Sequence, residues 1–429
     1  MVIAALFNAV VTGGIRDNRR TTADFARAIQ LNPNDARAYN DRGMARSKLG
    51  DNRGAIADYN EAVRINPNYD KAYYNRGNAH SELGDWQGAI VDYNEVVRIS
   101  PNYAEVYNNR GYAHYKLGDL QSAIADYNEV VRINPNHDSA YYNRGRAHYK
   151  LGNLQSAIAD YNEVVRINPN HASAYYNRGL TRSKLGDSRG AIADYTETVR
   201  INPNHAKAYK NRGNARSSLG DWQGAIADYD RALQINPNYT SAYCNRGYAR
   251  SEIGDYKGAI ADYDRALQIN PNDAITYNNR GVARRKLGDN KGAIVDYNET
   301  LRINPNYALA YDNRGNARRA LGDNKGALAD YNEAVRISPN FALAYRNRGN
   351  VLRELGDNKG AVADYNEALR IEPNNAFAYD NRGDARRALG DRQGAIADFQ
   401  KAANLFQQQG NKNDYQNTLN KIANLKPQI

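Results

Sequence analysis

The sequence predicts an all-α protein in which pairs of short helices stack one after another. Two observations lead to this class. The motif Asn-Arg-Gly recurs every 34 residues, with its glycine running from Gly77 to Gly383, and Asp41-Arg42-Gly43 precedes it in the same frame. Prolines recur at the same interval from Pro67 to Pro373. A fixed period of this length is the signature of a solenoid, in which each repeat contacts only its neighbours.

The repeats form eleven gapless copies over residues 36–409. They start at residues 36, 70, 104, 138, 172, 206, 240, 274, 308, 342 and 376. Positions 4 and 24 of the repeat account for 21 of the 34 tyrosines in the chain. Because the composition does not shift along the 429 residues, we expect one repeated design and not several unlike domains.

Each repeat should contain two helices. In the first repeat we predict helix A over 37–49 and helix B over 53–66. Gly50 supplies a left-handed stop and Asp51 an N-cap for helix B. Pro67 cannot continue helix B, and Asn68 is the candidate N-cap of the next helix A. Since neither helix can bury its apolar face alone, the pairs should stack on one another.

The two ends of the chain depart from the repeat. Residues 17–35 match the second half of a repeat, whereas 1–16 have lost the helix A pattern. We therefore interpret 1–35 as a degenerate N-terminal repeat or cap. Residues 410–429 carry one apolar stripe of Tyr415, Leu419 and Ile422 and predict a C-terminal capping helix.

These residues resemble the tetratricopeptide repeat (TPR) family, in a bacterial type with NRG, LGD and GAIADY segments. In the first repeat the signature falls on Gly43, Leu49-Gly50, Ala55 and Pro67. The resemblance implies a right-handed α-solenoid, or superhelix, of helix-turn-helix units with a concave groove. It also implies a non-enzymatic scaffold for protein–protein interaction. Two positions depart from the family: position 7 is Arg in every repeat, where the family has Leu, and position 11 is mostly Arg or His, where it has Tyr.

A carboxylate recurs on the inward face of helix B. Position 23 is Asp in all eleven repeats, from Asp58 to Asp398, and the position 7 arginine, from Arg42 to Arg382, lies on the inward arc of helix A. A half-buried carboxylate needs a partner. We therefore predict ion pairs between these positions, and no catalytic role for the aspartates.

The composition excludes several classes of site. One cysteine, Cys244, excludes a disulfide framework and favours a reducing compartment. The apolar stretch at residues 2–11 is too short to span a membrane. Equivalent histidines lie one repeat apart, too far to share a zinc ion. We expect a cytoplasmic protein that is not an enzyme, with no cofactor, metal or membrane association.

Six positions of helix A form its outer arc: 2, 5, 6, 9, 12 and 13. We name this arc the variable face, because its residues change between repeats while the opposite arc barely does. The exception is position 6, which carries a ladder of asparagines: Asn75, Asn109, Asn143, Asn177, Asn211, Asn245, Asn279, Asn313, Asn347 and Asn381. A row of carboxamides can pair with the backbone of an extended peptide, and it looks like the ladder of the O-linked N-acetylglucosamine transferases. Hydrogen bonding inside the scaffold is the alternative.

The rest of the variable face divides the array into two halves. Repeats 2–5 carry tyrosines, which suit apolar or proline-containing segments: Tyr74, Tyr112, Tyr115, Tyr142, Tyr149 and Tyr176. Repeats 8–11 carry arginines at position 12, which suit acidic segments: Arg285, Arg319, Arg353 and Arg387. Beside these arginines, position 2 offers hydrophobic anchors: Ile275, Leu309, Leu343 and Phe377. Packing between neighbouring helices is the alternative for the tyrosines and aliphatic residues.

A two-carboxylate clamp, which some TPR domains use to bind a free C-terminus, is matched only in part. Lys210, Asn214 and Asn245 fit its first three members, but Ile275 and Asn279 stand where a Lys and an Arg are needed.

We predict a peptide-binding scaffold and keep two alternatives open. The first is binding of RNA or single-stranded nucleic acid, which the net charge of +11 permits, although Asp312, Asp380 and Asp384 on the variable face would repel phosphates. The second is an accessory TPR module of a multi-protein enzyme such as a glycosyltransferase.

Overall fold

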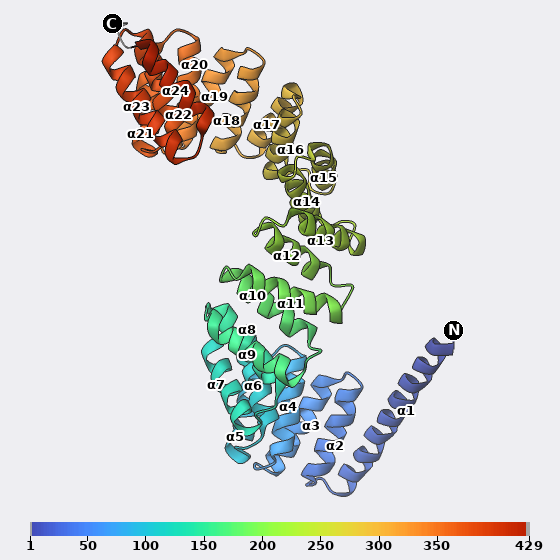
Figure 1. Ribbon diagram of the computed structural model, residues 1–429. Helices are drawn as coiled ribbons and strands as arrows, with labels where there is room; N and C mark the ends of the chain where they lie inside the picture. Colours follow the sequence, from blue (N-terminus) through green and yellow to red (C-terminus); the bar gives the residue numbers. More distant parts are fainter. Residues whose placement is uncertain (1, 426–429) are drawn as a thin grey trace. The chain divides into compact units, whose positions relative to one another are not determined.

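The computed structural model describes residues 2–425, with side chains from residue 17 onward, and these residues form helices and no strands (Figure 1). They divide into an N-terminal body, residues 1–215, and a C-terminal body, residues 216–429. The predicted all-α class, with stacked helix pairs, is confirmed.

The N-terminal body holds the first helices of the chain, and the twelfth ends just beyond it. They are α1 (Val2–Leu31), α2 (Ala36–Lys48), α3 (Asn52–Ile65), α4 (Asp70–Glu82), α5 (Trp86–Ile99), α6 (Ala104–Leu117), α7 (Leu120–Ile133), α8 (Asp138–Leu151), α9 (Leu154–Ile167), α10 (Ala172–Lys184), α11 (Ser188–Ile201) and α12 (Ala206–Ser217).

The C-terminal body holds the remaining helices. They are α13 (Trp222–Ile235), α14 (Thr240–Glu252), α15 (Tyr256–Ile269), α16 (Ala274–Lys286), α17 (Asn290–Ile303), α18 (Ala308–Ala320), α19 (Asn324–Ile337), α20 (Ala342–Glu354), α21 (Asn358–Ile371), α22 (Ala376–Ala388), α23 (Arg392–Gln408) and α24 (Lys412–Leu425).

Within each body the even-numbered helices from α2 on are the A helices, and the odd-numbered ones from α3 are the B helices. Each B helix other than α11 and α13 packs on its own A helix and on the helix that follows, as in the series α2, α3, α4 and α5 (Figure 1). In the first repeat both helices begin and end one residue before the predicted bounds. Residues 2–31 form one continuous helix, α1, which contacts α2. The interpretation of residues 1–35 as a degenerate repeat, and of residues 410–429 as a cap, stays a prediction.

The turns inside the repeats follow the predicted chemistry. Gly50 has φ of 82°, a left-handed conformation that glycine adopts without steric cost. Asp51 is the N-cap of α3, and its Oδ1 accepts a hydrogen bond from the Gly54 amide at 2.9 Å. Equivalent caps precede most of the other B helices.

The turns between repeats correct one prediction. Asn68 is not the N-cap of α4, because residues 66–69 form a turn and α4 begins at Asp70, so the capping position falls on Tyr69. Position 34 is thus the cap position throughout. Where it is polar, the side chain accepts a hydrogen bond from the first turn of helix A, as Asp35, His137, His171, Asp273 and Asn375 do.

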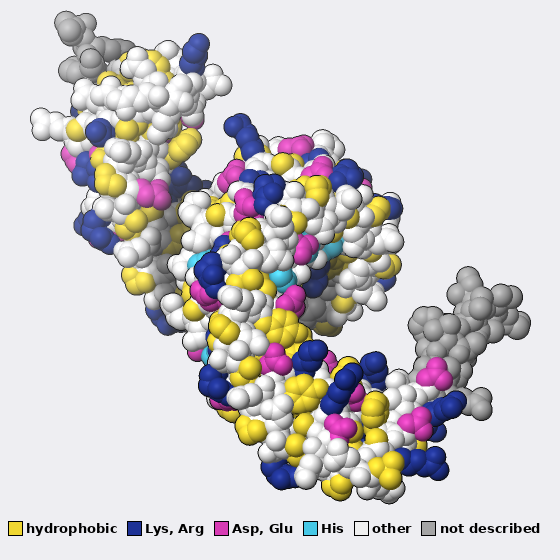
Figure 2. All heavy atoms as spheres, turned by 90° about the horizontal axis from the view of Figure 1, so that it is seen from below, with side chains coloured by type: hydrophobic (Ala, Val, Ile, Leu, Met, Phe, Trp, Pro, Cys, Tyr) yellow, Lys and Arg dark blue, Asp and Glu magenta, His cyan; other side chains and the backbone are white. Residues whose placement is uncertain are grey.

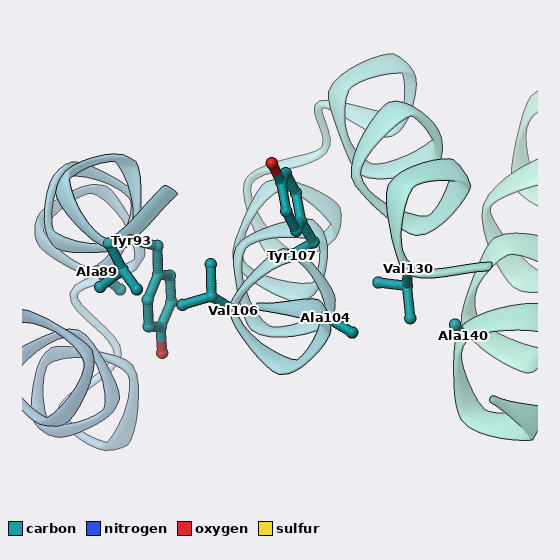
Figure 3. Packing of buried hydrophobic residues seen from close by; sticks show 8 residues of the cluster. Ala89, Tyr93, Ala104, Val106, Tyr107, Val130 and Ala140 are labelled. Carbon is teal, nitrogen blue, oxygen red and sulfur yellow. The ribbon is translucent and has the colours of Figure 1, made fainter. Parts of the chain in front are cut away.

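The core of each repeat is the aromatic ring at position 24 packed against the glycine at position 8. A Cβ on Gly145 would lie 2.8 Å from Cε1 of Tyr161, so only glycine lets the two helices approach this closely. Smaller apolar residues join successive repeats: Val106 of α6 points at Tyr93 of α5, and Val130 of α7 points at Ala140 of α8 (Figure 3).

The predicted ion pairs between positions 7 and 23 are confirmed. Arg42 donates from Nε and Nη2 to the carboxylate of Asp58, at 3.0 and 2.5 Å. The same pair forms at Arg76, Arg110, Arg144, Arg178, Arg246, Arg280, Arg314, Arg348 and Arg382. Burial raises the pKa of Asp92, Asp126 and Asp296, and the hydrogen bonds from the paired arginine oppose that shift.

The position 7 arginines also join neighbouring repeats. Arg76 donates from Nη1 to Oδ1 of Asn60 in the preceding repeat at 2.7 Å, and Arg348 does the same to Asn332 at 2.9 Å. Each of these guanidinium groups therefore binds one acceptor in its own repeat and one in the repeat before it.

Candidate functional site

The variable face lines an open cavity in the N-terminal body. The cavity measures about 1080 Å³ and takes residues from four successive repeats. On the variable face these include Ser47, Asn78, Asn109, Tyr112 and Asn143. Side chains that differ between repeats therefore face one continuous space, which is what a peptide-binding surface requires.

The asparagine ladder connects helix A to the repeat before it. Nδ2 of Asn177 donates to the hydroxyl of Tyr142 at 3.0 Å, and Nδ2 of Asn313 donates to Oδ1 of Asn278 at 3.1 Å. The acceptor belongs to position 5 or position 9 of the preceding repeat. Equivalent bonds are made by Asn75, Asn109, Asn211, Asn347 and Asn381.

These bonds use at least one N–H of the Nδ2 group of each of those asparagines and match the structural alternative for the ladder. Asn143 instead lines the large cavity, and Asn279 accepts a hydrogen bond from the adjacent Asn278. Asn245 also has an interaction partner. A role of the ladder in binding a peptide stays a prediction.

The predicted tyrosines fall into two groups. Tyr74, Tyr142 and Tyr176 at position 5 lie beside the buried position 24 rings, with ring centroids 6.0 to 6.3 Å apart, and accept hydrogen bonds from the ladder. Tyr115 and Tyr149 line a second cavity of about 240 Å³ in the N-terminal body. Tyr112 lines the large cavity and packs edge-on against Trp86. The first group therefore belongs to the scaffold and the second lines the cavities, although Tyr115 itself is largely buried.

Cations that the sequence reasoning missed lie over these tyrosine rings. Lys150 Nζ is 4.4 Å and Arg146 Cζ is 4.9 Å from the centroid of Tyr115, and Lys184 Nζ is 5.2 Å from that of Tyr149. Lys150 and Lys184 occupy position 13, and Arg146 occupies position 9. Both positions lie on the variable face. The helical spacing that placed the tyrosines there could therefore have placed these cations there too.

The predicted arginines of the C-terminal body are largely paired with carboxylates. Arg319 of α18 binds both oxygens of Glu354 in the next repeat, with Nε 3.1 Å from each. Arg387 and Arg353 lie 3.0 and 3.9 Å from the carboxylate of Asp384. Arg285 has a buried Nε without a hydrogen-bond partner among the described residues. Most of the positive charge predicted to attract an acidic ligand is therefore compensated within the protein.

The last helix adds a further cation to this network. Lys421 of α24 donates to Asp380 at 2.6 Å and to Asp384 at 2.8 Å, on the variable face of α22. Nearby, Asp312 accepts hydrogen bonds from Asn347 and Asn316, and burial raises its pKa.

The predicted hydrophobic anchors are exposed. Ile275 has 61% of its surface accessible and Leu309 has 39%, and Leu343 is exposed to a similar degree. Phe377 packs on Phe406 with ring centroids 5.0 Å apart, yet it keeps 46% of its surface exposed.

Family models match most of the repeat array. A model described as TPR repeat matches residues 45–84, 77–118, 247–288, 315–354 and 349–390. Models described as tetratricopeptide repeat match residues 108–172, 206–239, 274–307, 160–193 and 228–261. The chain belongs to the tetratricopeptide repeat family. No curated protein matches it.

Several solved TPR structures are similar to this chain. MamA is 28% identical over 38% of this chain and 94% of its own, with a TM-score of 0.37. YrrB, whose structure is described as a TPR protein with an unusual peptide-binding site, is 24% identical over 43% and 95%, with a TM-score of 0.40. Yeast Tom70 is 16% identical over 91% and 95%, with a TM-score of 0.44.

The departures of this TPR protein from its family at positions 7 and 11 have one explanation. Where position 11 is arginine, it acts as a second donor to the buried aspartate, as Arg182 Nη1 does to Asp194 at 2.9 Å. His80 and His114 occupy position 11 beside Asp92 and Asp126. In the tenth repeat the residue is Leu352, and Arg348 is the one side chain seen to bind Asp364 in the described part of the chain.

The histidines at position 34 cap helices. Nδ1 of His137, His171 and His205 accepts a hydrogen bond from the third residue of the following A helix, at 3.1 to 3.2 Å. Among the described residues, no three His, Cys, Asp or Glu side chains are grouped so that they could hold a metal ion. None of the described helices is long and apolar enough to cross a membrane.

The partial carboxylate clamp of this TPR protein stays a prediction. Lys210 and Asn214 lie on α12 and Asn245 lies on α14. Burial lowers the pKa of Lys210, and both asparagines have interaction partners.

Proposed function

We propose that this TPR protein is a non-enzymatic scaffold that binds extended protein segments on the variable face of its A helices. The observation that carries the proposal is the cavity of about 1080 Å³, lined by residues of four successive repeats. An extended segment offers a backbone hydrogen-bonding group at each residue and side chains on alternate sides. Successive repeats can therefore each contact a successive part of the extended segment.

The chemistry of the cavity suits such a ligand. Asn78, Asn109 and Asn143 present carboxamides, and Tyr112 presents an aromatic ring beside Trp86. Carboxamides supply donors and acceptors for a peptide backbone, and aromatic rings provide apolar contact at low cost in conformational entropy. The hydrogen bonds between the ladder and the preceding repeat would hold these groups in place before the ligand arrives.

For the C-terminal body we propose a preference for acidic segments with hydrophobic anchors. The exposed Ile275, Leu309 and Phe377 support the apolar part. Arg319, Arg353 and Arg387 lie beside carboxylates of the protein itself. The acidic part therefore rests on Arg285 and on Arg346 of α20, whose Cζ lies 6.0 Å from the ring centroid of Phe377.

Charge distribution favours a protein ligand over nucleic acid. Acidic side chains lie among the basic ones on the face shown in Figure 2. Glu82 lines the large cavity itself. A surface for a nucleic acid backbone needs continuous positive charge, because successive phosphates repel interspersed carboxylates. We also propose a cytoplasmic location, supported by the single cysteine, Cys244, whose thiol is half-buried beside Thr276.

Selection from a random-peptide display library on the intact chain tests the proposal. We expect peptides that lose about tenfold or more in affinity when Tyr112→Ala removes an aromatic contact of the cavity. Val91→Ala is the matched control, because Val91 is an exposed apolar residue of helix B. Enrichment of no peptide, or equal losses for both variants, would contradict the proposal.

A further inference from the structure

The smaller cavity of the N-terminal body differs in chemistry from the large one. It measures about 240 Å³ and lies between α6, α8, α9 and α10. Its lining includes Tyr115, Arg146, Tyr149, Lys150 and Tyr161, with Asn177 at the neighbouring repeat. A space of this size admits a side chain but not a folded segment.

In several repeats the buried tyrosine at position 24 finds a partner on the variable face of its own repeat. The hydroxyl of Tyr93 donates to Asn78 at 2.8 Å, and that of Tyr365 donates to Asn350 at 2.8 Å, both at position 9. Tyr195 instead shares a hydrogen bond of 3.2 Å with Ser183 at position 12. Asparagine at position 9 or serine at position 12 can therefore satisfy this hydroxyl, whereas the hydroxyls of Tyr127 and Tyr297 are buried without a hydrogen-bond partner in the described part of the chain.

The fourth repeat lacks both partners, as the third and eighth repeats do, but of the three position 24 tyrosines it is Tyr161 that lines the smaller cavity. Position 9 is Arg146 and position 12 is Tyr149, and the hydroxyl of Tyr161 has no hydrogen-bond partner among the described residues. Tyr161 is 99% buried by relative surface, yet it lines the cavity together with those two residues. Burial raises its pKa, so its hydroxyl stays protonated at neutral pH and is available as a donor.

The cations of the cavity are not paired with carboxylates. Arg146 makes a long hydrogen bond of 3.4 Å to the hydroxyl of Tyr115, and in the described part of the chain neither it nor Lys150 lies within 4.0 Å of an acidic oxygen. Both are held over the ring of Tyr115. The variable face of repeats 4 and 5 has no acidic residue at all. Unpaired cations and an unsatisfied hydroxyl donor therefore converge on one small space.

We propose that this cavity is the subsite for a glutamate or aspartate side chain of the bound segment, whose carboxylate accepts hydrogen bonds from Arg146, Lys150 and Tyr161. The subsite rests on the proposed function, since it assigns one side chain of the segment. Charge-assisted hydrogen bonds to a carboxylate are about twice as strong as neutral ones, so this residue would dominate the choice of sequence. A nucleic acid strand is less well matched, because Glu82 and Glu105 lie on the same variable face.

A double-mutant cycle on peptides selected against the intact chain tests the subsite. Each acidic residue of a selected peptide is replaced by its amide, and fluorescence anisotropy gives the affinity for the wild type and for Arg146→Gln/Lys150→Gln. We expect one acid-to-amide change to cost the wild type about tenfold or more and to cost the double variant little. The single variant Tyr161→Phe, which keeps the ring, should lose part of the same preference.

The controls separate charge from position. Lys291→Gln/Lys325→Gln removes the same charge from exposed helix B positions and should leave the preference unchanged. Selected peptides whose acidic residues make no difference, or make an equal difference in both double variants, would overturn the subsite while leaving the scaffold proposal intact. A short oligouridylate that binds more tightly than any peptide and is lost on Arg146→Gln/Lys150→Gln would also overturn it.

Discussion

The cations of repeats 3–5 and those of repeats 9–11 stand on the same face of the same scaffold but have different partners. In repeats 4 and 5, Arg146 and Lys184 lie over tyrosine rings. In repeats 9–11, Arg319 and Arg387 lie beside Glu354 and Asp384. A tyrosine ring carries no net charge, so a cation above it can still attract an anionic ligand. A cation in an ion pair is neutralised by the carboxylate of the protein. Charge at a surface position therefore indicates a ligand only once its neighbours are known.

The comparison assumes that the same buried ion pairs stabilise both regions. The tenth repeat tests this assumption best, because its position 11 residue is Leu352 and not a second arginine. Arg348→Met leaves the buried Asp364 without the arginine that binds it, and we expect a loss of about 3–5 kcal/mol in the local free energy of unfolding. Arg314→Met is the matched control, because Arg318 still donates to Asp330 at 2.8 Å. Hydrogen exchange of the amides of α18–α21 measures both. Equal losses of stability in the two variants would show that the position 11 arginine does not help to compensate the buried aspartate.

The ion-paired region should be the more sensitive to removal of its acid. Asp384→Asn withdraws a carboxylate that faces Arg353, Arg387 and Lys421, and we expect α24 to lose about 1–3 kcal/mol of local stability. Arg146→Gln in the aromatic region should cost less than about 1 kcal/mol, because a partly exposed cation–π contact is weak. Hydrogen exchange reports each loss. A greater loss of local stability in Arg146→Gln than in Asp384→Asn would contradict the view that the charges of repeats 9–11 stabilise the scaffold more than those of repeats 4 and 5.

The smallest expected effect is a pH dependence of the free energy of unfolding, which we expect from the histidine cap of α12. Burial lowers the pKa of His205, whose neutral Nδ1 caps α12, and Lys207 acts in the same direction. Between the folded pKa and the unfolded value of 6.5 the unfolded chain binds more protons, so stability falls as the pH drops below neutrality. We expect a loss of about 1 kcal/mol between pH 7.5 and 5, the size of one cap.

His205→Asn provides the control for the pH effect, because asparagine caps a helix without titrating. Asn375 does so for α22 in the C-terminal body, where its Oδ1 accepts from the Ala378 amide. The melting temperature of the variant should change less with pH than that of the wild type. An identical pH dependence in both proteins would exclude the cap as its source.

The scaffold could be predicted from the sequence because its determinants repeat. The Gly at position 8, the left-handed Gly50 and the Arg42–Asp58 pair all follow from spacing and elementary sterics. The helix cap at position 34 was missed, because residues 66–69 form a turn and helix A begins one residue later than a cap at Asn68 requires. The helix start depends on this backbone turn, which the spacing of the asparagines does not reveal.

The candidate site could be predicted only in part. Residues of the variable face line both cavities of the N-terminal body, together with residues at other positions such as Trp86 and Tyr161, and their role in binding stays a prediction. The partners of the variable-face residues were not predicted, because they come from the preceding or following repeat, as Tyr142 does for Asn177 and Glu354 for Arg319. A pattern within one repeat does not contain those pairs. They depend on which two repeats are neighbours.

The bonds from the position 7 arginines of repeats 2–11 to the preceding repeat make the repeats exchangeable. Arg348 finds its second acceptor in Asn332, and Arg246 finds it in Asp230, at the same position of the repeat before. A repeat inserted between two others would offer its own acceptor to the arginine of the repeat that follows. Its own arginine would bind the acceptor of the repeat that precedes it. The array can therefore gain or lose whole repeats without leaving a buried guanidinium unsatisfied.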